Sequence, residues 1–162
     1  MSMVDYFLKI EGVKGESQDH KHKEEVQIDS FSFGCHQRGT GGHGGGGGSG
    51  KASLQDFSFV KKVDKSSPVL FLKCCTGEHL KKVHLTCRKA GKEQQEYWTV
   101  TLEGCLVSSY TTGGPHDGVA LPTDQVSINF AKIQIEYKEQ KADGTLGAGV
   151  KAGWDVATTK AV

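Results

Sequence analysis

Residues 39–50 read Gly-Thr-Gly-Gly-His-Gly-Gly-Gly-Gly-Gly-Ser-Gly and are followed by Lys51. Such a run predicts neither helix nor strand interior, because glycine loses more backbone entropy on ordering than any other residue. The run stands between two segments that alternate like strands, and not at a terminus. We interpret it as an extended glycine-rich loop projecting from a β domain, either a disordered tether or an arm that orders against a partner.

Alternation of apolar and polar residues predicts strands in most of the remaining chain. The predicted strands cover residues 6–13, 24–37, 53–63, 79–89, 96–110, 125–137 and 150–156. The alternation changes phase near Ser30 and again between Phe130 and Ile133, which predicts a β-bulge in two of these strands. A turn is expected at Asp143-Gly144 and a loop over residues 111–118.

One helix is predicted, and its end signals are clear. Ser67 is suited to the N-cap, Pro68 to the first helical position, and Gly77 to the position that ends the helix. Residues 69–72 are all apolar, so most of the helix is expected to pack against the sheet. One helix among several strands predicts a mainly β fold, an antiparallel β-barrel or sandwich with one flanking α-helix.

Length and composition limit the class of protein. The 162 residues fit a single domain over residues 1–162, and a net charge of +1 argues against nucleic acid or a membrane as partner. The five cysteines show no disulfide spacing, which indicates reduced thiols in a chain made in the cytoplasm. The N-terminus lacks the basic and apolar regions of a signal peptide, so export is expected to proceed without a cleaved signal.

Residues 45–51 match a phosphate-binding loop, which raises the possibility of an enzyme. Ala52 stands where that loop has the serine or threonine that holds Mg²⁺, and a strand rather than a helix is predicted after Lys51. Amides at a helix N-terminus are therefore not expected to face a phosphate here. Nucleotide binding that depends on Lys51 would restore this hypothesis.

Other catalytic or metal-binding constellations are not found in the sequence. His20 and His22 are interpreted as solvated side chains, because their spacing is not that of a zinc pair. No serine or cysteine stands in a nucleophile motif. Lys61 and Lys62 are interpreted as a solvated face or a subunit contact. We expect no catalytic residues, no metal and no cofactor.

Eight stretches, in order along nearly the whole chain, resemble a known family. They are residues 7–17 (FLKIEGVKGES), 50–59 (GKASLQDFSF), 64–68 (DKSSP), 88–91 (RKAG), 95–97 (QEY), 126–132 (VSINFAK), 141–144 (KADG) and 153–155 (GWD). The set is similar to the haemolysin-coregulated protein family, Hcp, the tube subunit of bacterial type VI secretion. One departure lies at residues 158–160, where the family pattern has an asparagine before the lysine.

The resemblance implies a structural protein rather than an enzyme. It implies a β-barrel like that of phage tail-tube proteins, assembled as a homohexameric ring. Such rings stack into a hollow tube inside a contractile sheath, next to a baseplate, and are expelled with the spike protein VgrG. It also implies that small effector proteins travel in the lumen of the ring.

The expected contacts between subunits lie on the glycine-rich arm and on nearby basic residues. A chain without side chains can approach another backbone closely, and the cost of ordering it is offset only by contacts with a neighbour. We therefore expect stable rings that stack weakly in solution. The residues expected at these contacts are Arg38, Gly42, His43, Gly46, Lys51, Lys61 and Lys62.

Ser32 is the candidate for the channel wall. It stands between Phe31 and Phe33, and successive residues of a strand point to opposite faces. If the two phenylalanines enter the core, Ser32 faces outward, and the resemblance implies that this face lines the channel. Two alternatives remain: a solvated strand serine, and a monomeric β-barrel that binds a small ligand beneath a glycine-rich lid.

Overall fold

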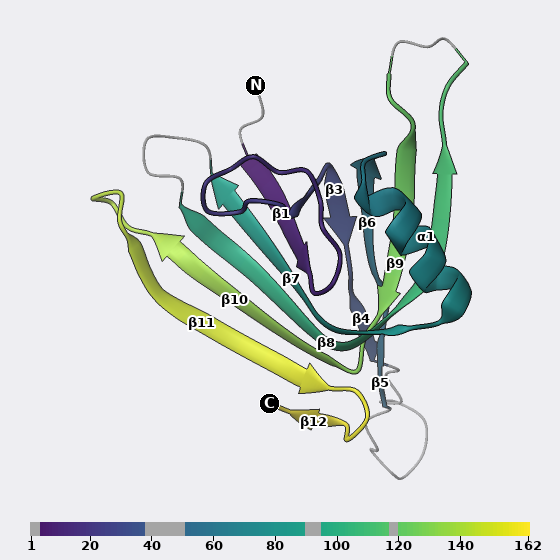
Figure 1. Cartoon of the computed structure of the whole chain (residues 1–162). Helices are drawn as coiled ribbons and strands as arrows, with labels where there is room; N and C mark the ends of the chain where they lie inside the picture. The colour runs from purple at the N-terminus through teal and green to yellow at the C-terminus, as the bar shows by residue number, and fades with distance from the viewer. Residues whose placement is uncertain (1–3, 38–50, 90–94, 117–119) are drawn as a thin grey trace.

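The computed structural model describes residues 4–37, 51–89, 95–116 and 120–162. Within these ranges the chain forms twelve strands and one helix (Figure 1). In order they are β1 (Val4–Ile10), β2 (Val26–Ile28), β3 (Ser30–Ser32), β4 (Cys35–Gln37), β5 (Ala52–Leu54), β6 (Phe57–Lys62), α1 (Ser66–Thr76), β7 (His79–Lys89), β8 (Glu96–Gly113), β9 (Thr123–Asn129), β10 (Lys132–Gln140), β11 (Leu146–Asp155) and β12 (Lys160–Ala161).

The long strand β8 organises an antiparallel ten-stranded sheet. One edge of β8 pairs with β7, and β7 continues through β1 to β2. The other edge pairs first with β10 and then, beyond Leu106, with β9. Strands β11 and β12 extend the β10 side, whereas β6 and β3 extend the β9 side. The sheet therefore has two branches that share β8. One is the seven-stranded path from β12 to β2, and the other is β8, β9, β6 and β3.

These two branches curl toward one another, as expected for a barrel or sandwich. Strand β2 pairs with β1, and the next strand along the chain, β3, pairs with β6. The amide of Asp29 donates to the carbonyl oxygen of Val60 at 2.8 Å in the step between them. The phase change near Ser30 is therefore a change of partner strand, and the bulge predicted there is wrong.

The second predicted bulge is also a break between strands. Strand β9 ends at Asn129 and β10 begins at Lys132, so the predicted strand 125–137 is two strands. The amide of Ala131 donates to the carbonyl oxygens of Glu103 and Gly104 at 3.0 and 3.1 Å. Gly104 has a φ of +62°, and a Cβ atom on it would lie 2.9 Å from the Ala131 Cβ. This glycine permits the bend at which the chain exchanges partners.

Two strands are longer than the sequence predicts. Strand β8 continues to Gly113, so the first part of the predicted loop 111–118 is strand paired with β9. Strand β11 begins at Leu146 rather than at residue 150. Its start reads Leu-Gly-Ala-Gly, a composition that disfavours strands, but pairing with β10 overrides that local preference.

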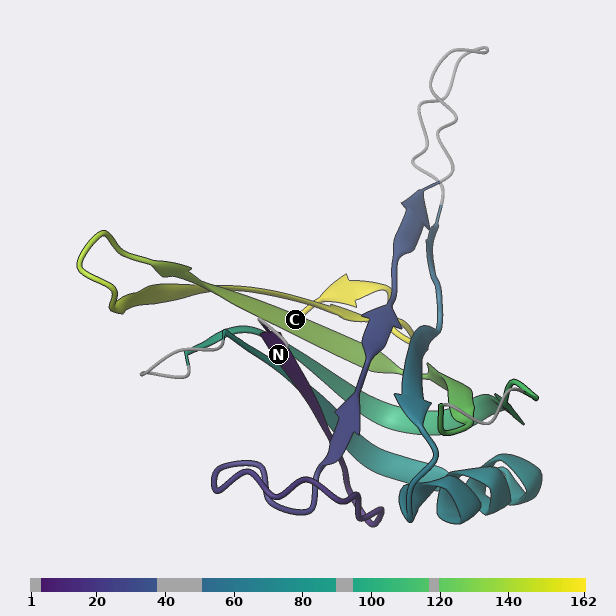
Figure 2. The ribbon, with the colours of Figure 1, turned by 90° about the horizontal axis from the view of Figure 1, so that it is seen from above.

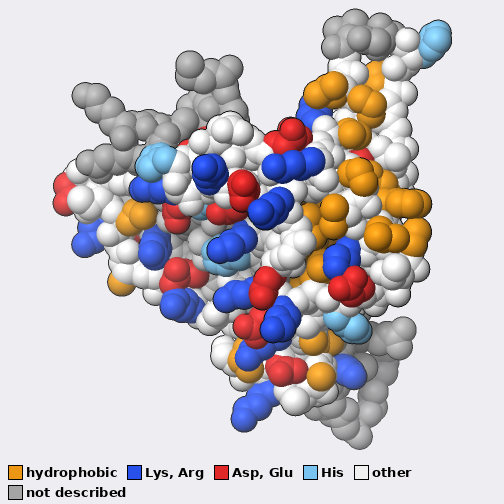
Figure 3. All heavy atoms as spheres, viewed as in Figure 1, with side chains coloured by type: hydrophobic (Ala, Val, Ile, Leu, Met, Phe, Trp, Pro, Cys, Tyr) orange, Lys and Arg blue, Asp and Glu red, His pale blue; other side chains and the backbone are white. Residues whose placement is uncertain are grey.

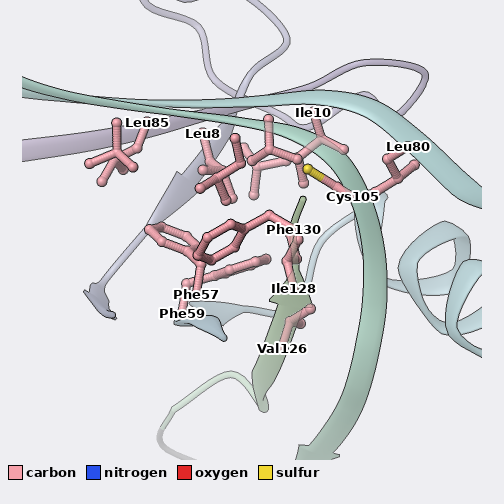
Figure 4. Close-up of a cluster of buried hydrophobic side chains, with 14 of the residues drawn as sticks. Leu8, Ile10, Phe57, Phe59, Leu80, Leu85, Cys105, Val126, Ile128 and Phe130 are labelled. Atoms are coloured by element: carbon pink, nitrogen blue, oxygen red, sulfur yellow. The ribbon is translucent and has the colours of Figure 1, made fainter. Parts of the chain in front are cut away.

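The core lies between the two branches of the sheet. Buried aromatic and aliphatic side chains from seven strands meet there, some of which are drawn in Figure 4. Phe57 lies at its centre, with ring centroids 6.0 Å from Phe31, 6.1 Å from Phe33 and 6.2 Å from Phe59. These phenylalanines come from β3, β6 and the residue after β3, so they are the aromatic part of the core that the β3–β6 side contributes.

Helix α1 differs from its prediction at the start and on its surface. It begins at Ser66, and the N-cap is Lys65, whose side chain makes no capping hydrogen bond, so the prediction of Ser67 as N-cap is wrong. It ends as predicted: Gly77 has a φ of +67° and its amide donates to the Lys73 carbonyl oxygen at 3.0 Å. Leu70 is its one buried apolar side chain. The expectation that most of the helix packs against the sheet is also wrong.

The loop before β2 is held against β1 and β7 by charged side chains. Arg88 Nη2 donates to Asp19 Oδ2 at 2.6 Å and lies 3.5 Å from Asp5 Oδ2. His22 is stacked on Phe7 with centroids 4.4 Å apart, and its ring nitrogens lie within hydrogen-bond distance of two glutamates. His22 is buried, so its interpretation as a solvated side chain is wrong.

Replacing Asp19 by asparagine is expected to destabilise the fold in a pH-dependent way. The hydrogen bond from Arg88 holds the pKa of Asp19 well below its usual value. Asp19→Asn is expected to lower the free energy of unfolding at pH 7 by about 1.5–3 kcal/mol, the typical contribution of a hydrogen bond to a charged group. A carboxyl whose pKa is lower in the folded than in the unfolded state stabilises the fold above its unfolded pKa. This stabilisation is lost as the pH falls toward its folded pKa.

The difference in free energy of unfolding between wild type and Asp19→Asn should therefore become smaller below about pH 4, the usual pKa of an aspartate. Urea unfolding at pH 7 and pH 3 measures this. Asp29→Asn is the control, because Asp29 forms an ion pair with Lys62 at 3.1 Å in which both side chains are about half exposed. It should cost less than about 1 kcal/mol. An equal effect of Asp19→Asn at both pH values would contradict the prediction.

Candidate functional site

An uncharged polar face covers the outer side of β3, β6, β9 and β8. Strand pairing places its side chains in two rows that cross these four strands. One row is Ser32, Ser58, Ser127 and Ser109, and the other is Ser30, Val60, Gln125 and Thr111. We call these eight residues the serine face. Seven of the eight carry a hydroxyl or amide group and none carries a charge.

Alternation along the strands determines this face. The residues between its members point the other way: Phe59 and Val126 are buried in the core, and Phe31 packs against it. Because neighbours in a strand face opposite sides, the serines face outward. Ser32 is exposed, which confirms the predicted direction of its side chain.

The serine face is slightly hollow and is bounded by charges at its ends. It lines a depression of about 250 Å³, and Ser58 Oγ lies 2.9 Å from Ser127 Oγ. At one end Lys62 pairs with Asp29 at 3.1 Å. At the other end Asp56 accepts hydrogen bonds from Ser108 at 2.6 Å and Asn129 at 2.9 Å. The central area offers hydroxyl donors and acceptors without fixed charge.

The residues expected at subunit contacts are found in three situations. Lys51 is exposed and directly precedes β5, so a strand follows the glycine tract as predicted. Lys62 is exposed at the end of β6. Lys61 is fully buried, so its interpretation as part of a solvated basic face is wrong. Arg38, Gly42, His43 and Gly46 lie outside the described residues.

The base of the arm is described on both sides of the glycine tract. Strands β4 and β5 pair with each other and with no other described strand. They project from the main sheet as a two-stranded extension (Figure 2). Every residue of β4 in this extension has an exposed side chain.

Lys61 belongs to a buried polar cluster that joins β6, β9 and α1. Its Nζ donates to Asp124 Oδ2 at 2.7 Å, Ser67 Oγ at 2.8 Å and Asp64 Oδ1 at 2.9 Å. Ser67 Oγ donates to Asp124 Oδ2 at 2.5 Å, and Tyr110 donates to Asp124 Oδ1 at 2.8 Å. Each polar atom named here has a partner, so the cluster fixes the start of the helix to the barrel.

Electrostatics support a charged Lys61–Asp124 pair. Burial would raise the pKa of Asp124, but hydrogen bonds from Lys61, Ser67 and Tyr110 outweigh it and hold the pKa below the usual value. Burial, and then the hydrogen bond to Asp124, raises the pKa of Tyr110.

The sequence analysis did not predict this buried cluster, although one signal for it was present. Lys61 is in phase with the buried Phe57 and Phe59, and Asp124 with the buried Val126.

No three histidine, cysteine or acidic side chains among the described residues are placed to hold a metal ion. All five cysteines are free, and burial raises the pKa of Cys87 and Cys105 to about 12. The one helix in the described part of the chain is too short to cross a bilayer.

Comparison with known proteins gives consistent matches. A family model described as "Type VI secretion system effector, Hcp" matches residues 7–137. Protein hcp1 of Pseudomonas aeruginosa is 52% identical over 155 residues, which cover 94% of this chain and 95% of that protein. Both matches extend over the serine face and the Lys61 cluster.

Solved structures show the same likeness. The crystal structure of Hcp1 from Salmonella typhimurium has a TM-score of 0.84 at 34% identity and covers 99% of this chain and 100% of that chain. A type VI secretion system effector from Yersinia pestis has a TM-score of 0.76 at 30% identity, with coverage of 94% and 100%. A further type six secretion system protein, at 24% identity, shares the fold with a TM-score of 0.92.

Proposed function

The chain belongs to the Hcp family of type VI secretion proteins, and from this premise we propose that it is a structural subunit of the secretion tube. The subunit assembles as a homohexameric ring, and rings stack into a hollow tube. The tube lies within the contractile sheath, is built on the baseplate and leaves the cell with the spike protein VgrG. The chain is made in the bacterial cytoplasm and is exported without a cleaved signal.

The serine face is the observation that supports this proposal most. A channel wall that admits different proteins has to be wetted, and it has to avoid strong attraction or repulsion for cargo of either charge. Hydroxyl groups meet both needs, because each donates and accepts a hydrogen bond and carries no charge. The serine face has this composition over four strands, and the charged residues Lys62, Asp29 and Asp56 lie beyond its two ends. We therefore assign it to the lumen, where effectors are carried.

The direction of β4 and β5 supports contacts between stacked rings or between neighbouring subunits of one ring. Strands β4 and β5, which stand on either side of residues 38–50 in the sequence, project from the main sheet (Figure 2). Lys51 at the base and Lys62 at the end of β6 are both exposed and remain proposed contacts. Lys61 is omitted, because its side chain is fully buried and its Nζ is bound to three side chains.

Electron microscopy of the purified protein tests the assembly. Negatively stained protein at micromolar concentration is expected to show annuli with a central hole. Particles of single-chain size would contradict the proposal and would favour a monomeric β-barrel that binds a small ligand.

Ser32→Gln is expected to weaken cargo retention without breaking the ring. Ser32 is exposed on the serine face, and glutamine adds bulk to the channel wall at that point. Co-purification of a small effector with the ring should fall several-fold relative to wild type. Thr158→Gln is the control, because Thr158 is exposed in the turn before β12, outside the serine face. Unchanged retention by Ser32→Gln, or an equal loss in Thr158→Gln, would remove Ser32 from the cargo surface.

A further inference from the structure

Helix α1 presents an apolar surface to solvent. The exposed fractions of Val69, Phe71 and Leu72 are 37%, 54% and 58%. We call these three side chains the helix patch. The helix carries no charged residue from Ser66 to Leu72, whereas a solvent-facing helix ordinarily has charged residues on its outer side. Hydrophobic side chains gather over α1 in the surface view (Figure 3).

A second apolar surface lies where the two branches of the sheet do not meet. It is a groove of about 210 Å³ between β10–β11 and the segment that joins β3 to β4. We call it the seam groove. None of its lining residues is charged. They are Phe33, Gly34, Cys35, Leu54, Phe130, Ile133, Ile135, Ala152, Gly153 and Trp154.

These two surfaces flank opposite edges of the four strands that carry the serine face. The helix packs beside the second half of β8, where Phe71 and Tyr110 make an edge contact with centroids 6.0 Å apart. Beyond Leu106 that half of β8 pairs with β9 alone among the described strands. The seam groove begins at Phe33, directly after β3, which pairs with β6 alone among the described strands. One chain therefore does not cover its own groove with its own helix patch.

We propose that the helix patch of one subunit docks in the seam groove of the next. One protruding surface and one concave surface on opposite sides of a chain form a heterologous contact, which closes into a ring when the rotation allows it. The same contact would place the serine faces of neighbouring subunits side by side, because the two surfaces flank its two edges. This inference rests on the proposed ring and identifies the second copy of the chain as the occupant of both surfaces.

The chemistry of the two surfaces favours this contact. Neither contains a charged side chain, so docking buries apolar area without desolvating an ion. Phe71 is a large, half-exposed aromatic side chain, and buried aromatic anchors of this kind dominate the energy of many interfaces. Exposed apolar patches on soluble proteins commonly mark interaction sites.

Two single substitutions test the contact from its two sides. Leu72→Glu places a charge on the helix patch at a side chain that is 58% exposed. Ala152→Glu places a charge in the seam groove at an exposed residue of β11. Val150→Glu is the matched control, since Val150 lies two residues earlier on β11, is 72% exposed and does not line the groove. Circular dichroism checks that all three variants are folded.

Native mass spectrometry is expected to give rings for wild type and Val150→Glu, and single chains for Leu72→Glu and Ala152→Glu. An equimolar mixture of the two monomeric variants, at about ten times the concentration that suffices for wild-type rings, should form dimers. In such a dimer the intact helix patch of Ala152→Glu occupies the intact groove of Leu72→Glu. Growth stops there, because both surfaces left free carry a glutamate.

Three outcomes would overturn this inference. They are rings formed by either glutamate variant, loss of rings in Val150→Glu, and a mixture that remains monomeric. None of these outcomes affects the proposed function while wild type forms rings. Wild-type protein that is itself monomeric would contradict the proposed function instead.

Discussion

Lys61→Ala should lower the free energy of unfolding by about 3–5 kcal/mol, the cost of removing one partner from a buried ion pair. The substitution leaves Asp124 with no exposed surface and without its closest cation, which lies 2.7 Å away in the wild type. Ser67 and Tyr110 still donate to the carboxylate, but neither carries charge. The start of α1 should loosen as well, because Lys61 also binds Asp64.

Urea unfolding at one fixed protein concentration measures this effect, because assembly contributes to apparent stability. Lys132→Ala is the control, since Lys132 also lies in a strand, is not a proposed subunit contact, and forms an ion pair with Glu103 at 3.8 Å that is exposed on both sides. It should cost about 0–1 kcal/mol, as surface ion pairs do. A loss below about 1 kcal/mol for Lys61→Ala would contradict a charged buried pair.

Phe57→Ala is expected to have an effect of similar size through packing. Phe57 is fully buried, and its ring lies between those of Phe31, Phe33 and Phe59. Removing a buried phenylalanine ring typically costs about 3–5 kcal/mol, because transfer energy is lost and a cavity remains. The three neighbouring rings come from only two segments of chain, so they have limited freedom to fill that space.

Thermal unfolding should show this loss as a decrease in Tm on the order of 10 °C for a chain of this size. Phe57→Leu is the control, because leucine keeps most of the buried volume and should cost less than alanine. Equal midpoints for Phe57→Ala and wild type would show that Phe57 is not at the centre of the core.

Much of the fold could be predicted from alternation and end signals. Residues 79–89 were predicted as a strand from the alternation of Val83, Leu85 and Cys87, and β7 has these bounds. Gly77 was predicted to end the helix, and its positive φ explains why glycine stands there. The outward direction of Ser32 followed from Phe31 and Phe33, both of which pack against the core.

The errors arose where the chain changes its partner strand. A change of phase near Ser30 looks the same in a sequence whether it marks a bulge or a transfer from β1 to β6. The break between β9 and β10 depends on hydrogen bonds from Ala131 to the distant residues 103 and 104. Such long-range pairings leave no local signal in either segment.

Two polar side chains are buried where the sequence did not predict it. Lys61 was interpreted as part of a solvated face or a subunit contact, and His22 as solvated because its spacing from His20 is not that of a zinc pair. Both are buried against carboxylates from distant parts of the chain: Asp124 for Lys61, and Glu96 for His22. The apolar run in α1 gave the opposite error. It was predicted to be buried against the sheet, but Phe71 and Leu72 face solvent in the single chain.

The mass of the native assembly tests the central claim most directly. Native mass spectrometry of the purified wild-type chain at micromolar concentration is expected to show a dominant species of about six times the 17.5 kDa chain. A dominant species of 17.5 kDa under the same conditions would contradict a ring-forming tube subunit.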